Sequence, residues 1–196
     1  GCKEDVERAF QSMPFKDEIS YTTMINSYMM YRDTQSCLAV FRFMQNIGFR
    51  LNKITYVSTI SSCFSKVNNQ DTEQLHVYVI NSILGPDVVL ETALITMYGR
   101  CGKADISRRV FDRMIEMNVC TWNAMIMAFS QLEDNYVYMN HLQAQMMQEG
   151  TFADKITFVT MISIVSIDSI HDGKRMHASI VGSAFECDMS LANALL

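Results

Sequence analysis

The sequence predicts an all-α protein, a right-handed α-solenoid of stacked helix-turn-helix repeats. Three observations predict it: a pattern recurs every thirty-odd residues, its apolar residues have helical spacing, and the 196 residues include only two prolines and eight glycines. The recurring segments align without gaps. They are ISYTTMINSY (19–28), ITYVSTISSC (54–63), VLETALITMY (89–98), CTWNAMIMAF (120–129) and ITFVTMISIV (156–165), and SLANALL (190–196) begins a sixth.

One anchor residue in each segment measures the period. The anchors are Tyr21, Tyr56, Glu91, Trp122, Phe158 and Ala192, which lie 35, 35, 31, 36 and 34 residues apart. We therefore expect a partial unit (a second helix) at 1–17, complete units at 18–52, 53–87, 88–118, 119–154 and 155–188, and a truncated unit at 189–196. Both chain ends fall inside a unit, so we expect the sequence to be part of a longer array.

The first half of each unit is predicted to be a helix. Its apolar residues follow the spacing i, i+3, i+4, i+7, which places them on one helical face. The clearest examples are Tyr21, Met24, Ile25 and Tyr28, then Trp122, Met125, Ile126 and Phe129, and then Phe158, Met161, Ile162 and Val165.

The second half of each unit carries another stripe of the same spacing. It reads Cys37, Val40, Phe41 and Met44 in one unit and Ser107, Val110, Phe111 and Met114 in another. His76 and His177 stand where other units have phenylalanine, and we expect them to be packed histidines rather than ligands. Each unit is thus a helix hairpin whose apolar face only a stacked neighbour can cover.

The unit boundaries carry capping residues. Second helices end near Gly48 and Gly150, where a glycine suits a helix C-terminus. An Asn or Asp ends each complete unit, directly before the next first helix, where its side chain suits an N-cap. These residues are Asn52, Asp87, Asn118, Asp154 and Asp188.

Composition excludes several classes of protein. The chain is 49% hydrophobic, so it can bury a core, but it contains no run of eighteen apolar residues, and we expect no membrane span. The net charge of −5 argues against strong non-specific nucleic-acid binding. The six cysteines form no C-x-x-C pair, and Cys37, Cys63 and Cys120 are predicted to be reduced thiols that serve as small packing residues.

Four longer stretches resemble a known repeat family. They are VCTWNAMI (119–126), ALITMYGRCGKADISRRVFDRM (93–114), EDVERAFQSMP (4–14) and DGKRMHASIV (172–181). They resemble pentatricopeptide repeats, specifically those of the plant PLS subclass, in which long and short repeat types alternate. The units 53–87 and 155–188 resemble the long type, and 88–118 resembles the short type.

The resemblance implies that the array reads single-stranded RNA, with one base for each repeat. In such repeats two residues read the base: the residue after the anchor and the last residue of the unit. The implied pairs are Thr22 with Asn52, Val57 with Asp87, Thr92 with Asn118, Asn123 with Asp154, and Val159 with Asp188, and Asn193 opens a truncated sixth. The family's preferences imply adenine for the two Thr/Asn pairs and uracil for Asn123/Asp154, and leave the Val-bearing units undecided. The implied word is 5′-A-n-A-U-n-3′.

Two further groups of residues are implied to touch RNA. Apolar residues two positions before each anchor could clamp a base between adjacent units; they are Ile19, Ile54, Val89, Cys120 and Ile156. A lysine often faces phosphate late in the first helix of this family, and here only Arg100 supplies a basic residue at that place. With the acidic net charge, we expect this segment alone to bind RNA weakly and to lose affinity as salt rises.

No catalytic or metal-ligand constellation stands out in the sequence, so we expect no enzyme activity and no cofactor. Two functions remain open. The first is a sequence-specific RNA adaptor in a mitochondrion or chloroplast, most simply for C-to-U editing, with editing cofactors or a deaminase acting in trans or on a C-terminal region beyond this sequence. The second is a protein-interaction solenoid whose groove takes a peptide or partner helix.

Overall fold

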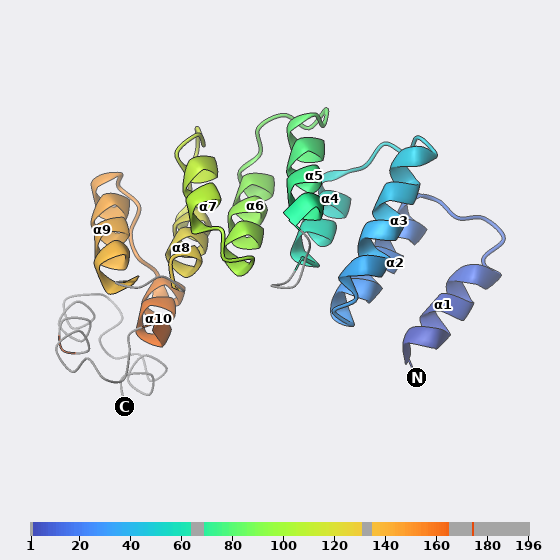
Figure 1. The fold of residues 1–196 in the computed structure, drawn as a ribbon, viewed down its shortest axis with the longest axis horizontal. Helices are drawn as coiled ribbons and strands as arrows, with labels where there is room; N and C mark the ends of the chain where they lie inside the picture. The colour runs from blue at the N-terminus through green and yellow to red at the C-terminus, as the bar shows by residue number, and fades with distance from the viewer. Residues whose placement is uncertain (1, 64–68, 131–134, 165–173, 175–196) are drawn as a thin grey trace.

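The computed structural model describes residues 2–63, 69–130, 135–164 and 174. All regular secondary structure in those ranges is α-helical, and the helices follow one another along the long axis of the molecule (Figure 1). They are α1 (Cys2–Ser12), α2 (Glu18–Met30), α3 (Thr34–Asn46), α4 (Lys53–Ser61), α5 (Asn69–Ile80), α6 (Val88–Arg100), α7 (Ala104–Phe111), α8 (Val119–Ala128), α9 (Asn135–Gln148) and α10 (Lys155–Ile164).

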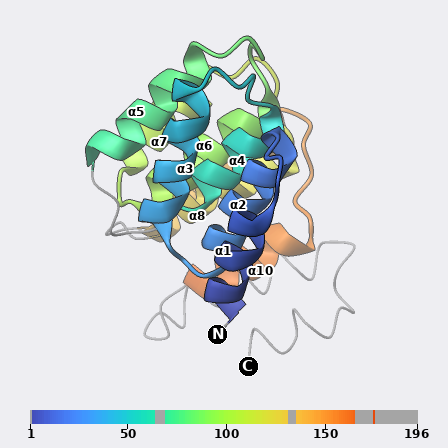
Figure 2. The same ribbon diagram turned by 90° about the vertical axis from the view of Figure 1, so that its right-hand side faces the viewer.

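The helices form two layers. The first helices α2, α4, α6, α8 and α10 contact one another in succession and make one continuous layer. Viewed along the array, α3, α5 and α7 gather on one side of α2 and α4 (Figure 2). This arrangement confirms the predicted all-α repeat solenoid in the described part of the chain. None of the described helices combines the length and apolar character that a membrane crossing needs.

The predicted caps are present at the ends of the helices. The side chains of Asn52, Asp87, Asn118 and Asp154 each accept a hydrogen bond from a backbone N–H in the first turn of the following helix. These bonds satisfy N–H groups that the helix itself leaves without an acceptor. Gly48 and Gly150, with φ of +80° and +75°, follow the ends of α3 and α9 as the sequence predicts. Asp188 lies outside the described residues.

The core runs continuously from one unit to the next through the anchor residues. Tyr56, Trp122 and Phe158 are buried, and three anchors meet an aromatic ring of the preceding second helix. The ring pairs are Phe10–Tyr21, Phe41–Tyr56 and Phe111–Trp122, with centroids 5.1, 5.5 and 4.7 Å apart. Such edge-to-face pairs contribute about 0.5–1.5 kcal/mol each beyond the area that they bury.

The junction between α5 and α6 differs, because His76 and Glu91 occupy the two places that rings take elsewhere. His76 turns instead to Tyr98 of α6, whose hydroxyl lies 2.9 Å from its Nδ1. The expected packed histidine is thus half-buried and hydrogen-bonded.

Two of the three cysteines predicted to pack are in the core. Cys37 and Cys63 are buried, whereas Cys120 is exposed, so the packing prediction is wrong for Cys120. Cys120 is the second residue of α8, and this position points away from the stripe that contains Trp122 and Met125.

Candidate nucleic-acid interface

An evenly repeated set of apolar side chains is exposed at the start of the first helices. Ile19, Ile54, Val89 and Ile156 are each the second residue of a first helix, and their exposed fractions are 72%, 63%, 49% and 63%. Cys120 holds the same place in α8 and is also exposed. Apolar groups that recur at one exposed place in every repeat have no role in the core, so this series is a candidate contact surface.

The structure connects the first predicted reading pair through a third residue. Thr22 Oγ1 of α2 lies 2.8 Å from Thr55 Oγ1 of α4. Thr55 in turn donates to Asn52 Oδ1 from its hydroxyl (3.2 Å) and from its backbone N–H (3.0 Å). Thr22, on one unit's first helix, and Asn52, at the end of the same unit, are therefore joined by Thr55 of the next unit.

The same chain of hydrogen bonds recurs two units later. Thr92 Oγ1 of α6 lies 2.9 Å from Thr121 Oγ1 of α8. Thr121 donates to Asn118 Oδ1 from its hydroxyl (3.2 Å) and its N–H (3.0 Å). We call these two sets, Thr22–Thr55–Asn52 and Thr92–Thr121–Asn118, the threonine relays.

The pair Asn123 and Asp154 is in direct contact. Asn123 Nδ2 donates to Asp154 Oδ1 over 3.2 Å, and the same oxygen accepts from the N–H and hydroxyl of Thr157. Burial alone would raise the pKa of Asp154, but the hydrogen bonds from Thr157 and Asn123 outweigh it and hold the pKa below its usual value. Asn123 Oδ1 is buried and accepts no hydrogen bond from the described residues.

The fourth pair is not brought into such contact. Asp87 receives Lys53 Nζ at 2.7 Å and caps α6, while Val57 of α4 is half-buried. The hydrogen bond from Lys53 is the largest cause that lowers the pKa of Asp87. Asp87 is thus held as a carboxylate at the boundary between units, with one oxygen committed to Lys53.

The remaining predicted residues are placed only in part. Val159 is exposed on α10, and Arg100 is exposed at the end of α6, where its guanidinium donates to the Ser61 carbonyl at 3.5 Å. Asp188 and Asn193 lie outside the described residues.

A family model described as "PPR repeat" matches residues 19–49, 92–119 and 120–134 of this chain. Its matches contain Thr22 of the first threonine relay and all three residues of the second, and they cover most of α2 and α6 and all of α8. Over its full length the chain is also 30% identical to the pentatricopeptide repeat-containing protein At5g27110 of Arabidopsis thaliana. The chain belongs to the pentatricopeptide repeat family.

The names of other Arabidopsis thaliana relatives include a chloroplast or mitochondrial location. The pentatricopeptide repeat-containing protein CRR2, chloroplastic, is 28% identical over 90% of this chain, and At4g31070, mitochondrial, is 28% identical over 95%. The chain spans 28%, 27% and 30% of At5g27110, CRR2 and At4g31070, which is less than a third of each.

Solved pentatricopeptide repeat structures have the same fold. The crystal structure of PPR10 from maize matches 93% of this chain with a TM-score of 0.61 at 13% identity. PPR10 in complex with an 18-nt psaJ RNA element matches 93% of this chain with a TM-score of 0.71 at 16% identity. The chain covers 32% and 27% of these two PPR10 chains.

Sequence reasoning missed the threonines that join the pentatricopeptide reading pairs. Thr55, Thr121 and Thr157 each stand directly before an aromatic anchor, in the words ITY, CTW and ITF. All three are fully buried and contact the capping residue of their own helix. The recurrence of threonine at this one place was the available signal, because a hydroxyl at the third helical residue can return to the N-cap.

Proposed function

We propose that this chain is a sequence-specific adaptor for single-stranded RNA, part of a longer pentatricopeptide array. The proposal rests on one observation. Exposed apolar side chains recur near the start of the first helices, together with hydrogen-bonded pairs of polar residues in which one member is a helix N-cap. A base needs a flat apolar contact and a small number of polar groups at its edge, and this surface offers both in the three repeats that contain Thr22, Thr92 and Asn123.

The direction of the hydrogen bonds supports adenine at the threonine relays. Because Thr55 donates its hydroxyl proton to Asn52, Thr22 must donate its own proton to Thr55. Thr22 then presents an acceptor, and Asn52, whose oxygen already takes two bonds, presents its NH₂ donor. The edge of adenine offers the complementary pair, an amino donor and a ring-nitrogen acceptor. The second relay has the same hydrogen-bond directions, so Thr92 presents an acceptor and Asn118 presents its NH₂ donor.

The hydrogen bonding at Asn123 favours a base with an N–H donor. Its NH₂ is directed to Asp154, so the amide oxygen is the group left to accept. This oxygen is buried in the structure, so the side chain would have to turn to present it to a base. Uracil carries such a ring N–H, in agreement with the family's preference for this pair.

The finer parts of the proposal concern the cellular task. The alternation of long and short units supports the PLS subclass, and with it recognition of C-to-U editing sites in a mitochondrion or chloroplast. The chloroplastic and mitochondrial names of the relatives support an organelle. A deaminase would then act in trans or from a C-terminal region of the longer protein, together with editing cofactors.

Fluorescence anisotropy with short RNAs tests the proposal. An RNA containing A-n-A-U should bind more tightly than RNAs in which these bases are permuted, and more tightly than the matched DNA. The double variant Thr92→Asn with Asn118→Asp should move the preference at that position from adenine to uracil. One base contact is worth about 1–3 kcal/mol, or about five- to a hundredfold in affinity. Equal affinity for every permutation would leave the scaffold function as the better explanation.

A further inference from the structure

The junction between α5 and α6 lacks the aromatic pair that fills three other junctions. Phe41 and Tyr56 lie 15 residues apart and pack edge to face, and His76 and Glu91 hold the corresponding positions with the same separation. Glu91 is the one described anchor that is not aromatic. Because neither side chain fills the space of the two rings, the missing volume should remain as a pocket.

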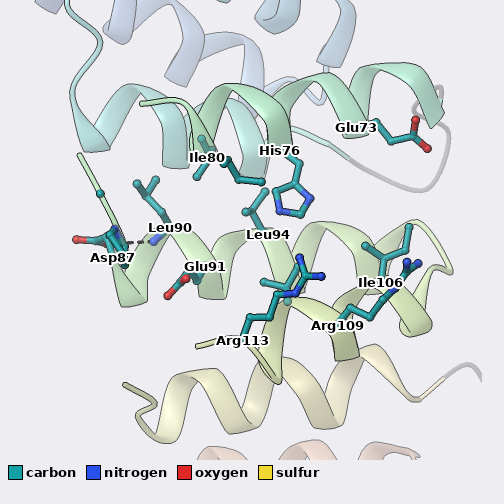
Figure 3. A pocket seen from close by; sticks show the side chains of 14 residues that line it. Glu73, His76, Ile80, Asp87, Leu90, Glu91, Leu94, Ile106, Arg109 and Arg113 are labelled. Atoms are coloured by element: carbon teal, nitrogen blue, oxygen red, sulfur yellow. Dashed lines mark hydrogen bonds between the residues drawn. The ribbon is translucent and has the colours of Figure 1, made fainter. Parts of the chain in front are cut away.

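A pocket of about 600 Å³ lies at this place, between α5, α6 and α7. Its floor is apolar and includes the buried Leu90 and Leu94. Figure 3 shows His76 of α5, Glu91 of α6 and Arg113, in the turn after α7, around the same space. The volume falls within the range of about 300–1,000 Å³ that is usual for ligand sites.

Two charged side chains that line the pocket take no part in the ion pairs formed among the described residues. Asp87 is paired with Lys53 and Arg109 with Asp105, while Glu73 lies 3.8 Å from Lys103. The described part of the chain provides no ion pair for Glu91 or for Arg113. Burial raises the pKa of Glu91, and the nearby Asp87 raises it further, so its carboxylate is poorly stabilised here. A hydrogen-bond donor arriving from outside would relieve this cost.

We propose that this pocket binds a tryptophan side chain of a partner polypeptide, with an acidic residue beside it. The indole ring takes the volume left by the missing ring pair and packs against His76 and the apolar floor. Its N–H donates to the Glu91 carboxylate, and the neighbouring acidic side chain pairs with Arg113. Tryptophan suits such a site because it brings a large apolar ring and a single donor.

The charges around the pocket favour a polypeptide over a nucleotide. Three carboxylates, those of Glu73, Asp87 and Glu91, lie along its lining, against the two guanidinium groups of Arg109 and Arg113. A phosphodiester held close to this rim would be repelled. Asp87, a predicted base-reading residue, lines the pocket, and its carboxylate is paired with Lys53. Val89 and Thr92, two of the predicted RNA-facing residues of α6, do not line it. A polypeptide partner could therefore bind while these two residues contact RNA.

Fluorine NMR with a short peptide tests the proposal. The probe is acetyl-Gly-Trp-Asp-Gly-amide carrying 5-fluorotryptophan, whose signal should shift and broaden on titration with the chain. Glu91→Tyr restores the residue type of the other anchors and should fill the pocket. It should weaken binding at least about tenfold, while circular dichroism shows an unchanged helix content and a melting temperature no lower than that of the parent chain. Unchanged peptide binding by this folded variant would overturn the proposal.

Three controls test separately the indole N–H, the acidic residue of the peptide and competition by a nucleotide. A peptide with 4-fluorophenylalanine keeps an aromatic ring but lacks the N–H, and equal binding would overturn the role of Glu91 as acceptor. Replacing the peptide's Asp by Asn should weaken binding to the parent chain but not to Arg113→Gln, and an equal loss in both would overturn the pairing with Arg113. Finally, uridine monophosphate should not displace the peptide, since displacement would identify a nucleotide site instead.

Discussion

Thr22 of α2 and Thr55 of α4 share a hydrogen bond of 2.8 Å between their hydroxyl oxygens, although 33 residues separate them in the chain. Thr22 is only 8% exposed and Thr55 is fully buried. The bond joins two successive repeats at the layer of first helices, and it holds the polar groups proposed to read a base. The same residues therefore contribute to the stability of the stack and to its recognition surface.

Thr55→Val should reveal this double role. The valine keeps the volume, but it leaves the Thr22 hydroxyl without its partner and removes one donor from Asn52. We expect the free energy of unfolding to fall by about 1–3 kcal/mol, measured by urea titration. Thr121→Val should behave alike at the second relay.

The control is Thr23→Val, since Thr23 is exposed and its hydroxyl returns to the Ile19 carbonyl within α2. This change should cost less than about 0.5 kcal/mol. In RNA titrations only the relay variants should lose preference for adenine. A relay variant as stable and as selective as the parent chain would contradict the hydrogen-bond polarity described above.

Gly99→Ala should destabilise the chain, against the usual helix propensity. In an exposed helix this change gains about 1 kcal/mol. Here a Cβ on Gly99 of α6 would lie 2.7 Å from Ala128 Cβ and 2.8 Å from Ala128 Cα, so α6 and α8 would have to move apart. We expect a loss of about 1–3 kcal/mol in thermal or urea unfolding. The added change Ala128→Gly should recover part of it, and no recovery would show that the strain lies elsewhere.

Arg100→Gln should weaken RNA binding and reduce its salt dependence. Arg100 is exposed at the end of α6, and we propose, from the resemblance to other pentatricopeptide repeats, that it faces an RNA phosphate. Removing one phosphate contact should lower the slope of log K against log salt concentration by about one unit. Arg109→Gln on α7 is the matched control, because Arg109 is paired with Asp105 in the other layer. Equal effects of the two changes would indicate only a general loss of positive charge.

His76 should make the stability depend on pH in the window below its ordinary pKa of 6.5. Burial, and to a lesser degree the charge of Arg113, lowers the pKa of His76 below its ordinary value of 6.5. The folded state therefore favours the neutral ring. The stability that the neutral His76 ring contributes is fully present above the pKa that His76 has in the unfolded chain. This stability is lost as pH falls through the lower pKa that His76 has in the folded state. Melting temperatures should decline over this window, and the decline should be smaller in His76→Phe, which carries the ring found in other units.

Cysteine alkylation should report which face meets RNA. Burial raises the pKa of Cys37 to about 11 and that of Cys63 to about 12, so both should react slowly with iodoacetamide at pH 8. Cys120 is exposed among the apolar residues proposed to clamp bases, and it should react well before them. Peptide mass spectrometry should show that a matching RNA slows the labelling of Cys120, whereas a permuted RNA does so less. Equal labelling with and without RNA would place the RNA on another face.

The sequence by itself determined the helices, their caps and the repeat that orders them. Apolar spacing along the chain sets which face of each helix is buried, and Asn52, Asp87, Asn118 and Asp154 cap helices through bonds to residues two or three positions away. Interactions of such short range can be read directly from the order of residues.

Only the tertiary structure decided which side chains of different repeats meet. The threonine relays and the pocket at His76 and Glu91 join residues of neighbouring units, and Lys53 meets Asp87 from the opposite end of the same unit. The bonds Thr22–Thr55, Thr92–Thr121 and Lys53–Asp87 cross 33, 29 and 34 positions of the chain. Whether two such groups touch depends on the rotation and separation of packed helices. Those quantities follow from the volumes of many core side chains together, including the absence of a Cβ at Gly99 where α6 approaches α8.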